Sequence, residues 1–366
     1  MKKIRVAVIG LGFGAEFVPI YQKCNNAECV AICRRSVEEL NECGDRFGID
    51  KRYTDYYELL KDDKIDAVHI NTSLKDHAWM AIEALKAGKH VASTVPMGLT
   101  IDECLKIVEL EKNTGKVYMM METAVYTREY IYVKNLFKKG EIGRIQFMRG
   151  SHQQNMGLPG WKDYWYGLPP MYYATHALSP LSAMINKKFK TVRCLGSGRI
   201  QEEYVSNYGS PFAVETAQLT FENSDIVCEA TRSLFNTIRQ YRESFDIYGS
   251  KKSFEWEQVA GENPVIFSGY EDAHRIEIPD TDQILPKEIS NFTLKNKIVD
   301  KNHVSYIQGA GHGGSHPHMV HEFISAICQG RKAFIDSSLA ANWTISGILA
   351  HDSALQGGTI IEIPKT

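Results

Sequence analysis

The segment IRVAVIGLGFGA at residues 4–15 constrains the fold more strongly than any other part of this 366-residue chain. An apolar run of strand length leads directly into G-x-G-x-x-A, with Ala15 in the third small position. Gly10 permits a tight turn, and Gly12 lets the backbone approach a pyrophosphate. A helix that begins here would direct its N-terminus at the anion. The predicted cofactor turn therefore consists of Gly10, Gly12, Phe13, Gly14 and Ala15, with an ordinary strand–helix turn as the alternative.

The first third of the chain repeats this alternation of strand and helix. Apolar runs of strand length follow at 29–33, 67–71, 90–94 and 117–122, and amphipathic helical patterns lie between them, as at 76–90. Short, continuously apolar strands separated by such helices indicate a parallel sheet that is covered on both faces. We therefore predict an α/β fold with an N-terminal Rossmann-type, doubly wound parallel sheet over residues 1–124.

After residue 125 the pattern changes to consecutive strands joined by turns. Strand-like runs at 144–155, 191–200, 213–221, 225–234, 244–250 and 253–259 predict a large, mostly antiparallel open sheet. Helices are expected at about 127–139, 317–329 and 338–355, with a polar, irregular stretch at 260–316. We therefore predict a C-terminal α+β domain over residues 125–366, with the last helix packing back onto it.

Composition narrows the classes of partner. The net charge is −2 and no block of lysine or arginine occurs, so neither nucleic acid nor a membrane surface is an expected partner. No apolar run reaches the roughly 18 residues of a membrane span. The eight cysteines include no C-x-x-C pair, which predicts buried free thiols and a cytoplasmic location.

The end of the second predicted strand bears on the choice of cofactor. An acidic residue that holds the ribose of NAD usually stands here, but the chain reads Cys33-Arg34-Arg35-Ser36. Arg34 and Arg35 suit a 2′-phosphate and favour NADP slightly over NAD. NAD is expected instead if the cofactor stays tightly bound and is recycled. An arginine stacked on adenine, or a solvated basic turn, also fits these residues.

Two further segments carry a family resemblance. NTSLKDH at 71–77 and AGKHVASTVPMGLT at 87–100, together with Asp336, Trp343, Ser353 and a QGGTIIEIP tail, resemble the Gfo/Idh/MocA oxidoreductases over the whole chain. The resemblance implies a sugar or inositol substrate bound between two domains, and a homo-oligomer, dimer or tetramer, formed through the C-terminal sheet. It also places at the cofactor Asn71, Thr72, His77, Thr94, Pro96 and Glu122.

The chain departs from most members of that family at two positions. Thr94-Val95-Pro96 replaces a Glu-Lys-Pro motif, and Tyr172 replaces an aspartate four residues before His176. The segments HVASTVP, MMMETAVY, YYATHALSP and GHGG instead resemble the branch that contains NAD-dependent α-N-acetylgalactosaminidases.

This second resemblance implies cleavage of a glycoside by transient oxidation of its 3-hydroxyl, elimination, addition of water and re-reduction. His176 is the predicted base for the 3-hydroxyl, because a neutral imidazole accepts a proton near pH 7. Tyr126 is predicted to move the carbon-2 proton or to serve the leaving group. A simple sugar dehydrogenase, a non-catalytic nucleotide sensor and a metal-dependent hydrolase are the other classes considered.

The predicted substrate contacts come from aromatic and histidine-rich stretches. GWKDYWYG at 160–167 offers aromatic faces for a sugar, and GHGGSHPHMVH at 311–321 combines a glycine-rich loop with four histidines. Pro317 suits the first turn of a helix, on which His318 and His321 are expected to face solvent. No metal site is expected there. The predicted substrate residues are Arg128, Trp161, Tyr164, Tyr173 and His312.

Overall fold

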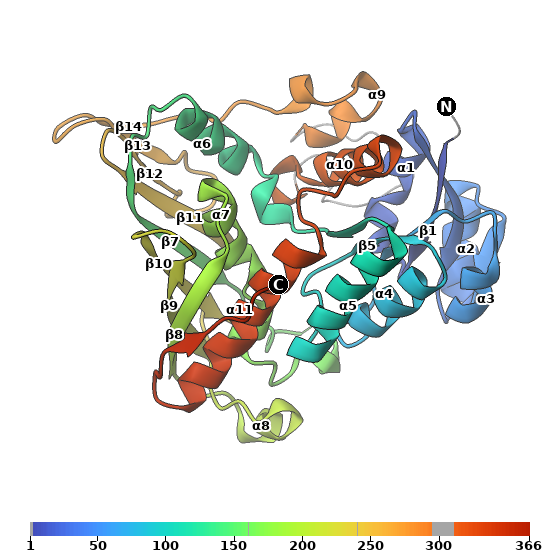
Figure 1. Ribbon diagram of the computed structural model, residues 1–366, viewed down its shortest axis with the longest axis horizontal. Helices are drawn as coiled ribbons and strands as arrows, with labels where there is room; N and C mark the ends of the chain where they lie inside the picture. Colours follow the sequence, from blue (N-terminus) through green and yellow to red (C-terminus); the bar gives the residue numbers. More distant parts are fainter. Residues whose placement is uncertain (1–2, 160, 240, 295–310) are drawn as a thin grey trace. The chain divides into compact units, whose positions relative to one another are not determined.

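The computed structural model describes residues 3–159, 161–239, 241–294 and 311–366 (Figure 1). Backbone contacts divide the chain into two compact units. The first comprises Met1–Arg128 and Asp280–Ala341, and the second comprises Glu129–Pro279 and Asn342–Thr366. This grouping differs from the linear division predicted at residue 124. The segment 280–341 belongs to the first unit because its apolar side chains share that unit's core.

The first unit is built on a six-stranded sheet with the strand order β3-β2-β1-β4-β5-β6. All neighbouring strands are parallel, which confirms the predicted doubly wound sheet. The short edge strand β3 is half-buried and too brief to give an apolar run, so the sequence pattern did not indicate it. The strands are β1 (Ile4–Ile9), β2 (Ala27–Cys33), β3 (Lys51–Tyr53), β4 (Ala67–Ile70), β5 (His90–Ser93) and β6 (Tyr118–Met120).

Helices flank this sheet, and two of them come from the later segment. Helices α9 and α10 both contact α1, and Figure 1 shows α10 beside it. Phe292 and Phe323 from this segment join the core formed by the sheet. The helices are α1 (Val18–Lys23), α2 (Val37–Phe47), α3 (Tyr56–Lys61), α4 (His77–Lys86), α5 (Ile101–Thr114), α9 (Lys287–Ser290) and α10 (His316–Gln329). Short 3₁₀ turns are η1 (Gly14–Glu16), η2 (Thr123–Val125), η5 (Asp282–Ile284), η6 (Asn291–Thr293) and η7 (Gly311–Gly314).

The second unit contains a nine-stranded sheet with the order β14-β13-β12-β11-β7-β10-β9-β8-β15. β7 and β10 are parallel and the other neighbours are antiparallel, so the predicted mostly antiparallel sheet is confirmed. Its strands are β7 (Ile145–Gln153), β8 (Phe189–Ser197), β9 (Val214–Phe221), β10 (Val227–Ser233), β11 (Arg242–Gly249), β12 (Ser253–Glu255), β13 (Val265–Phe267), β14 (Ala273–Arg275) and β15 (Ile361–Glu362).

One helix determines the chemistry of the second unit's buried sheet face. α7 (Thr175–Ile185) packs on β7, β10 and β11. A Cβ atom on Gly150 would lie only 2.0 Å from the carbonyl oxygen of Ala177, so this glycine lets α7 approach β7 closely. The Trp343 indole also donates to Ser182 Oγ at 2.8 Å, which fixes the last helix against α7. The other elements are α6 (Arg128–Lys138), α8 (Glu202–Tyr208), α11 (Ser337–Leu355), η3 (Asp163–Trp165) and η4 (Pro170–Tyr173).

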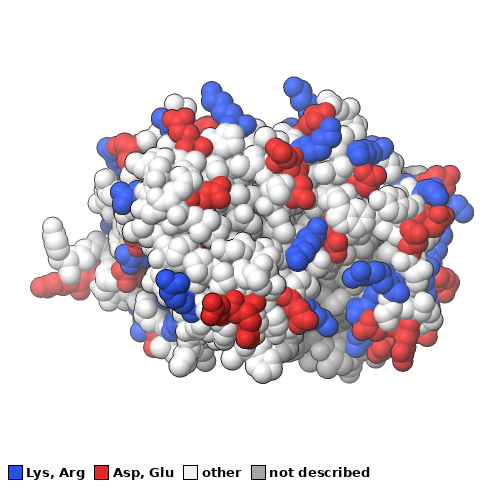
Figure 2. Space-filling model, turned by 90° about the horizontal axis from the view of Figure 1, so that it is seen from below, with Lys and Arg blue, Asp and Glu red and all other residues white. Residues whose placement is uncertain are grey.

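The surface drawn in Figure 2 carries charges of both signs. Lysine and arginine side chains alternate with aspartate and glutamate over this face, and uncharged residues cover much of it. Among the described residues, no helix is long and apolar enough to cross a membrane. All eight cysteine thiols are free. Seven of them are buried as predicted, whereas Cys328 is exposed.

Buried histidines make the stability of the fold depend on pH. Burial lowers the pKa of His69 on β4 to about 3, below the 6.5 of an exposed histidine. Because the unfolded chain takes up this proton first, stability is lost as the pH falls from about 6.5 toward 3, by about 1.4 kcal/mol per pH unit for one such group. We expect His69→Gln to reduce the slope of unfolding free energy against pH by that amount.

Urea unfolding between pH 6 and pH 4.5 measures this slope. His274→Gln is the matched control, since His274 lies exposed on β14 and its removal should leave the slope unchanged. An unchanged slope in His69→Gln would show that His69 is not held neutral in the folded protein.

Candidate functional site

The glycine-rich turn after β1 has one packed side and one open side. Gly10 has a φ of +80°, and a Cβ atom there would lie 2.4 Å from the backbone oxygen of Asn71. A Cβ atom on Gly12 would meet nothing within 4 Å. The turn is therefore fixed against β4 through Gly10, while Gly12 leaves room for an approaching pyrophosphate. These features fit a dinucleotide cofactor.

The helix after this turn begins later than expected. Gly14–Glu16 forms a 3₁₀ turn, and α1 starts only at Val18. Pro19 lies in the first turn of α1, where its fixed φ and missing N–H are tolerated. The predicted direct step from the motif into an α-helix was therefore wrong. Ala15 is nonetheless buried against the core, as its small size requires.

Of the two arginines that follow β2, Arg34 forms an ion pair with a carboxylate. The Nε of Arg34 donates to Glu39 Oε2 at 2.6 Å, whereas Arg35 is exposed and pairs with no acidic residue among those described. Ser36 caps α2 by accepting from the backbone N–H of Glu39. Glu39 thus supplies a carboxylate close to the end of β2, which the sequence analysis missed because it lies three residues inside a helix.

The structure brings together four of the residues assigned to the cofactor. His77 Nδ1 lies 2.9 Å from the Pro96 carbonyl oxygen, and its Nε2 lies 3.1 Å from the Thr72 carbonyl and 3.0 Å from Thr94 Oγ1. Burial lowers the pKa of His77, which favours a neutral ring. Asn71 is adjacent, and its side-chain amide donates to the His69 carbonyl. These loops therefore form one connected rim at the carboxyl ends of β4 and β5.

Glu122 and Tyr126 lie just beyond β6. Glu122 is buried and caps η2, where its Oε1 accepts from the Ala124 backbone N–H at 2.9 Å. The ring of Tyr126 is partly buried and packs edge-on against Phe334. Both positions follow a strand of the first unit as the sequence indicated. The assignment of Glu122 to the cofactor and of Tyr126 to proton transfer stays a prediction.

The GHGG loop contacts the glycine-rich turn after β1 through Phe13. The ring of His312 packs edge-on against Phe13, with the centroids 5.7 Å apart, and its Nδ1 lies 3.3 Å from His316 Nε2. His312 and Gly313 both have a positive φ, which bends the loop sharply. His312 thus lies beside a cofactor residue within the first unit, and its predicted contact with a sugar stays a prediction.

The predicted exposure of His318 was wrong. Its Nε2 lies 2.8 Å from Thr281 Oγ1 and the side chain is buried, because the 280–294 segment covers this face of α10. Arg128 is also buried, and it pairs with Asp280 at 2.9 Å and donates to the Thr293 carbonyl. These contacts give Arg128 a structural task in the same segment, and its predicted substrate contact is untested.

In the second unit, aromatic rings lead from the 160–167 stretch to His176. Trp161 and Tyr164 both contact Trp165, and Trp165 meets Tyr173 edge-on with centroids 4.9 Å apart. Tyr173 in turn meets His176 at 5.4 Å. Trp161 is more than one-third exposed. This wall of rings suits the apolar face of a sugar, and it unites three of the predicted substrate residues with the predicted base.

A row of charged and polar side chains crosses the buried face of the nine-stranded sheet. Glu243 on β11 lies directly opposite His152 on β7. On the next strand, β10, Arg232 lies opposite His152. Glu215 on β9 in turn lies opposite Arg232. Directly opposed residues point to the same face of a sheet. The row therefore lies on the face that α7 covers.

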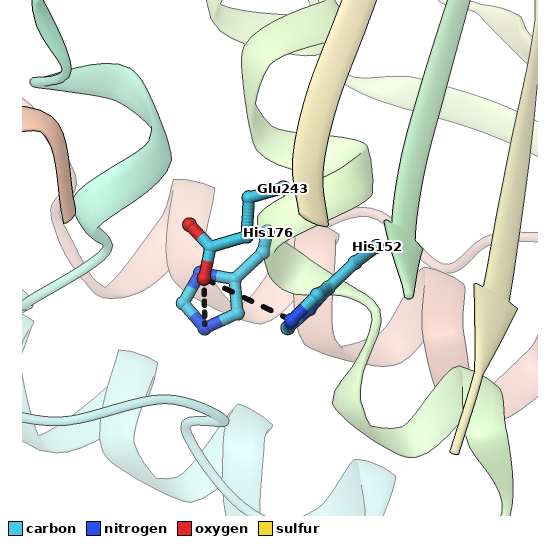
Figure 3. A group of neighbouring side chains, drawn as sticks. All are labelled: His152, His176 and Glu243. Carbon is cyan, nitrogen blue, oxygen red and sulfur yellow. Dashed lines mark ion pairs between the residues drawn. The ribbon is translucent and has the colours of Figure 1, made fainter. Parts of the chain in front are cut away.

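His176 sits at the Glu243 end of this row (Figure 3). As the second residue of α7 it places its Nε2 3.9 Å from Glu243 Oε1, and His152 Nε2 lies 3.8 Å from the same oxygen. The two imidazole rings meet edge-on at 4.9 Å. Both histidines are almost fully buried, and the Tyr241 hydroxyl donates to Glu243 Oε1.

Arg232 holds the backbone around this cluster. Its guanidinium donates to the carbonyls of Tyr173, His152 and Ser233 and to the side chain of Gln154. Its Cζ lies 5.2 Å from the centre of the Tyr173 ring. Burial lowers the pKa of Arg232 to about 10, a value at which it stays charged at neutral pH.

The comparisons with known proteins agree with this architecture. Residues 4–122 match the family described as "Oxidoreductase family, NAD-binding Rossmann fold", whose short name is GFO_IDH_MocA. Over the NAD-binding region that this family model describes, the chain is similar to the Gfo/Idh/MocA oxidoreductases. Full-length relatives include a protein named alpha-N-acetylgalactosaminidase from Shewanella oneidensis and a glycosyl hydrolase family 109 protein from Shewanella baltica. Each is 26% identical over an alignment that covers 100% of this chain and 85% of the relative.

Solved structures of two dehydrogenases share the fold of the whole chain. A levoglucosan dehydrogenase in complex with NADH and levoglucosan matches with a TM-score of 0.79 at 18% identity, with both chains covered completely. A myo-inositol 2-dehydrogenase from Lactobacillus plantarum matches with a TM-score of 0.76 at 18% identity, covering 99% of this chain and all of the other. At these identities the likeness establishes the fold alone.

The two positions at which the sequence departs from the usual Gfo/Idh/MocA pattern, Thr94-Val95-Pro96 and Tyr172, both make contacts in the structure. Thr94, in the Glu-Lys-Pro region, contacts His77. The Tyr172 ring packs edge-on against His351. A carboxylate does lie beside His176, but β11 supplies it as Glu243. Glu243 and His152 were not among the predicted site residues. The signal that the sequence offers for them is a polar residue at an inward-facing position of a strand.

Proposed function

We propose that this protein is an NAD-dependent enzyme that oxidises a sugar hydroxyl and uses that step to cleave a glycoside. The observation that carries the proposal is the buried pairing of His176 with Glu243 at the end of an aromatic wall. A base with a carboxylate partner is what removal of a hydroxyl proton requires, and aromatic faces suit a sugar ring. The full-length relatives named as glycosidases favour cleavage over oxidation alone.

In this proposal His176 accepts the proton of the 3-hydroxyl at Nε2. The resulting imidazolium lies 3.9 Å from the Glu243 carboxylate, which stabilises its charge. A nicotinamide cofactor held at the glycine-rich turn of Gly10 and Gly12 would supply the oxidant for carbon 3 and, afterwards, the reductant that restores it. The net redox change is therefore zero, and the cofactor does not need to leave.

Tyr126 is assigned the proton on carbon 2, which the neighbouring ketone makes acidic. Its loss forms a carbon–carbon double bond and breaks the bond from carbon 1 to the glycosidic oxygen, which leaves with a proton. Water then adds at carbon 1 and a proton returns to carbon 2. A phenol with an ordinary pKa near 10 is a weak base, so this assignment requires help from the bound substrate or cofactor.

A simple sugar dehydrogenase is the second candidate. The solved structures with this fold include complexes with NADH and levoglucosan, which favours oxidation without cleavage. Such an enzyme would use the same His176–Glu243 pair, but it would release reduced cofactor at each turnover.

The decisive experiment assays aryl glycosides with purified protein, without added cofactor, in D₂O. Nicotinamide released by denaturing the protein gives the cofactor content. Cleavage with deuterium at carbon 2 of the product supports the transient-oxidation route. Steady formation of NADH from free sugars and added NAD⁺ supports the dehydrogenase. Cleavage without deuterium at carbon 2 contradicts both.

We propose NAD rather than NADP as the resident cofactor. Glu39 engages Arg34 and would repel a 2′-phosphate. Arg35 pairs with no acidic residue in the described part of the chain, so its charge is available to a 2′-phosphate. We expect Arg35→Ala to weaken NADP⁺ binding by about tenfold, equal to about 1.4 kcal/mol, and to leave NAD⁺ binding unchanged. Calorimetric titration of cofactor-free protein with each nucleotide measures both affinities. Tighter binding of NADP⁺ than of NAD⁺ by the wild-type protein would contradict the proposed preference. Equal losses for the two in Arg35→Ala would show that Arg35 does not contact a 2′-phosphate.

We also propose a homo-oligomer, a dimer or tetramer, formed through the outer face of the nine-stranded sheet. Leu195 on β8 and Val227 on β10 are exposed on this sheet and support an interface there. Light scattering of wild-type protein and of Leu195→Glu would test it.

A further inference from the structure

We propose that the second unit binds a divalent transition-metal ion, most suitably Zn²⁺, through His152, His176 and Glu243. One nitrogen from each histidine and one carboxylate oxygen lie within 4.8 Å of one another. The three side chains come from β7, α7 and β11, and Figure 3 shows the Glu243 carboxylate directed toward both imidazoles. Among the described residues this is the single group with a metal-type set of ligands.

The separations are close to those that an ion requires. Bonds of about 2.0–2.2 Å to nitrogen and oxygen place three ligand atoms roughly 3–4 Å apart in pairs. The two nitrogen–oxygen separations are 3.8 Å and 3.9 Å. Small rotations of the three side chains, which shift their ligand atoms by on the order of 1 Å, would bring these atoms to bonding distance of an ion without movement of the sheet.

The donor set defines the class of metal and leaves room for a substrate. Two imidazoles and one carboxylate are a common ligand set of catalytic zinc, in which the fourth position stays open for water or substrate. Mg²⁺ and Ca²⁺ prefer oxygen ligands alone. The Tyr241 hydroxyl donates to Glu243 Oε1 and so supplies the outer hydrogen bond that typically orients a ligating carboxylate.

The neighbouring charges permit a cation here. The buried guanidinium of Arg232 repels a second positive charge nearby. Its N–H groups, however, donate to backbone carbonyls and to Gln154, so they do not occupy the ligand atoms of the site. Glu215 lies on the other side of Arg232 in the same cross-strand row. Glu243 supplies one negative charge directly beside the position of the ion.

The role of this ion rests on the proposed function, whereas its binding does not. An ion at this site would bind the oxygen of the sugar hydroxyl and lower its pKa, so that the proton passes to a water molecule. A bound NAD⁺ would supply the oxidant by accepting the hydride of the same carbon, so that the hydroxyl would become a ketone. The ion would thus replace the hydroxyl contact of the lysine absent at Thr94-Val95-Pro96. It would also take over the activation of the hydroxyl that the proposed function gives to His176, which would then act as a ligand of the ion.

The test uses full-length protein without an affinity tag, stripped with a chelator and titrated with Co²⁺. We expect one ion per chain with visible absorption typical of nitrogen and oxygen ligands. We expect affinity to fall about 100-fold or more in His152→Ala and in Glu243→Gln, since even outer-sphere changes cost 10–100-fold. His274→Ala is the matched control, because it removes an exposed histidine 3.4 Å from Asp272 in the same unit. This control should bind normally.

Further measurements keep the outcomes distinct. X-ray absorption of Zn²⁺-loaded wild type should report two imidazole nitrogens, and it requires no variant to fold. Failure to bind Co²⁺, or equal affinity in all variants, would overturn the site. Sugar oxidation by metal-free protein would overturn the catalytic role proposed for the ion and leave His176 as the base. Tight Co²⁺ binding without any sugar oxidation would support the site and contradict the proposed function instead.

Discussion

Substituting His176 by asparagine is expected to lower the rate of hydride transfer about 100- to 10,000-fold, the usual contribution of a positioned acid–base group. Asparagine keeps a polar side chain of similar reach, but it neither accepts a proton near neutral pH nor ligates a metal as imidazole does. It is also tolerated near the start of a helix, where His176 lies in α7. The nucleotide turn belongs to the other compact unit, so the nucleotide affinity should stay nearly unchanged.

Single-turnover reduction of bound NAD by sugar, followed by the absorbance of the reduced nicotinamide, measures this rate. Wild type should lose activity as the pH falls through the range in which imidazole becomes protonated, and the residual activity of the variant should lack that limb. His274→Asn is the control for a general effect of removing a histidine. A fully active His176→Asn protein would exclude His176 from the chemistry.

Local sequence signals were sufficient for most of the parallel sheet of the first unit. Its sheet follows from short apolar runs that alternate with amphipathic helices, and the turn at Gly10 follows from a glycine motif in the right context. Both signals lie within a few tens of residues, which is the range over which periodicity and turn chemistry act. Thr72, His77 and Thr94 of the rim were assigned to the cofactor through the family resemblance, and each of them follows a strand of the same parallel sheet.

The Glu243–His152 pair could not be found in this way. These residues lie far apart in the chain and meet only through the register of β11 against β7. A shift of one residue would send Glu243 to the opposite face, and the sequence alone does not determine that register. The same limit explains His318, because its burial depends on a distant segment that returns to cover α10. Non-local pairing therefore accounts for most of what was missed.

Gly12→Ala is expected to fold like wild type and to lose nucleotide affinity by tenfold or more, which is about 1.4 kcal/mol or more. The space around a Cβ atom on Gly12 is empty to 4 Å, so the protein accepts the methyl group, whereas a pyrophosphate would meet it. Gly10→Ala should behave differently, because a Cβ atom there would lie 2.4 Å from the Asn71 oxygen at a φ of +80°. We expect it to destabilise the fold by roughly 3 kcal/mol or more.

Urea unfolding and the nicotinamide content of each purified protein separate these two effects. Gly269→Ala provides the matched control, since its Cβ atom would meet only Asp272 at 3.7 Å, in the second unit. If the turn binds the cofactor, Gly12→Ala should combine wild-type stability with little bound nicotinamide, and the control should retain both. Normal cofactor content in Gly12→Ala would mean that the pyrophosphate does not approach this turn. Cofactor binding would then not explain why a glycine stands at position 12, because a dinucleotide bound elsewhere does not require this position to lack a side chain.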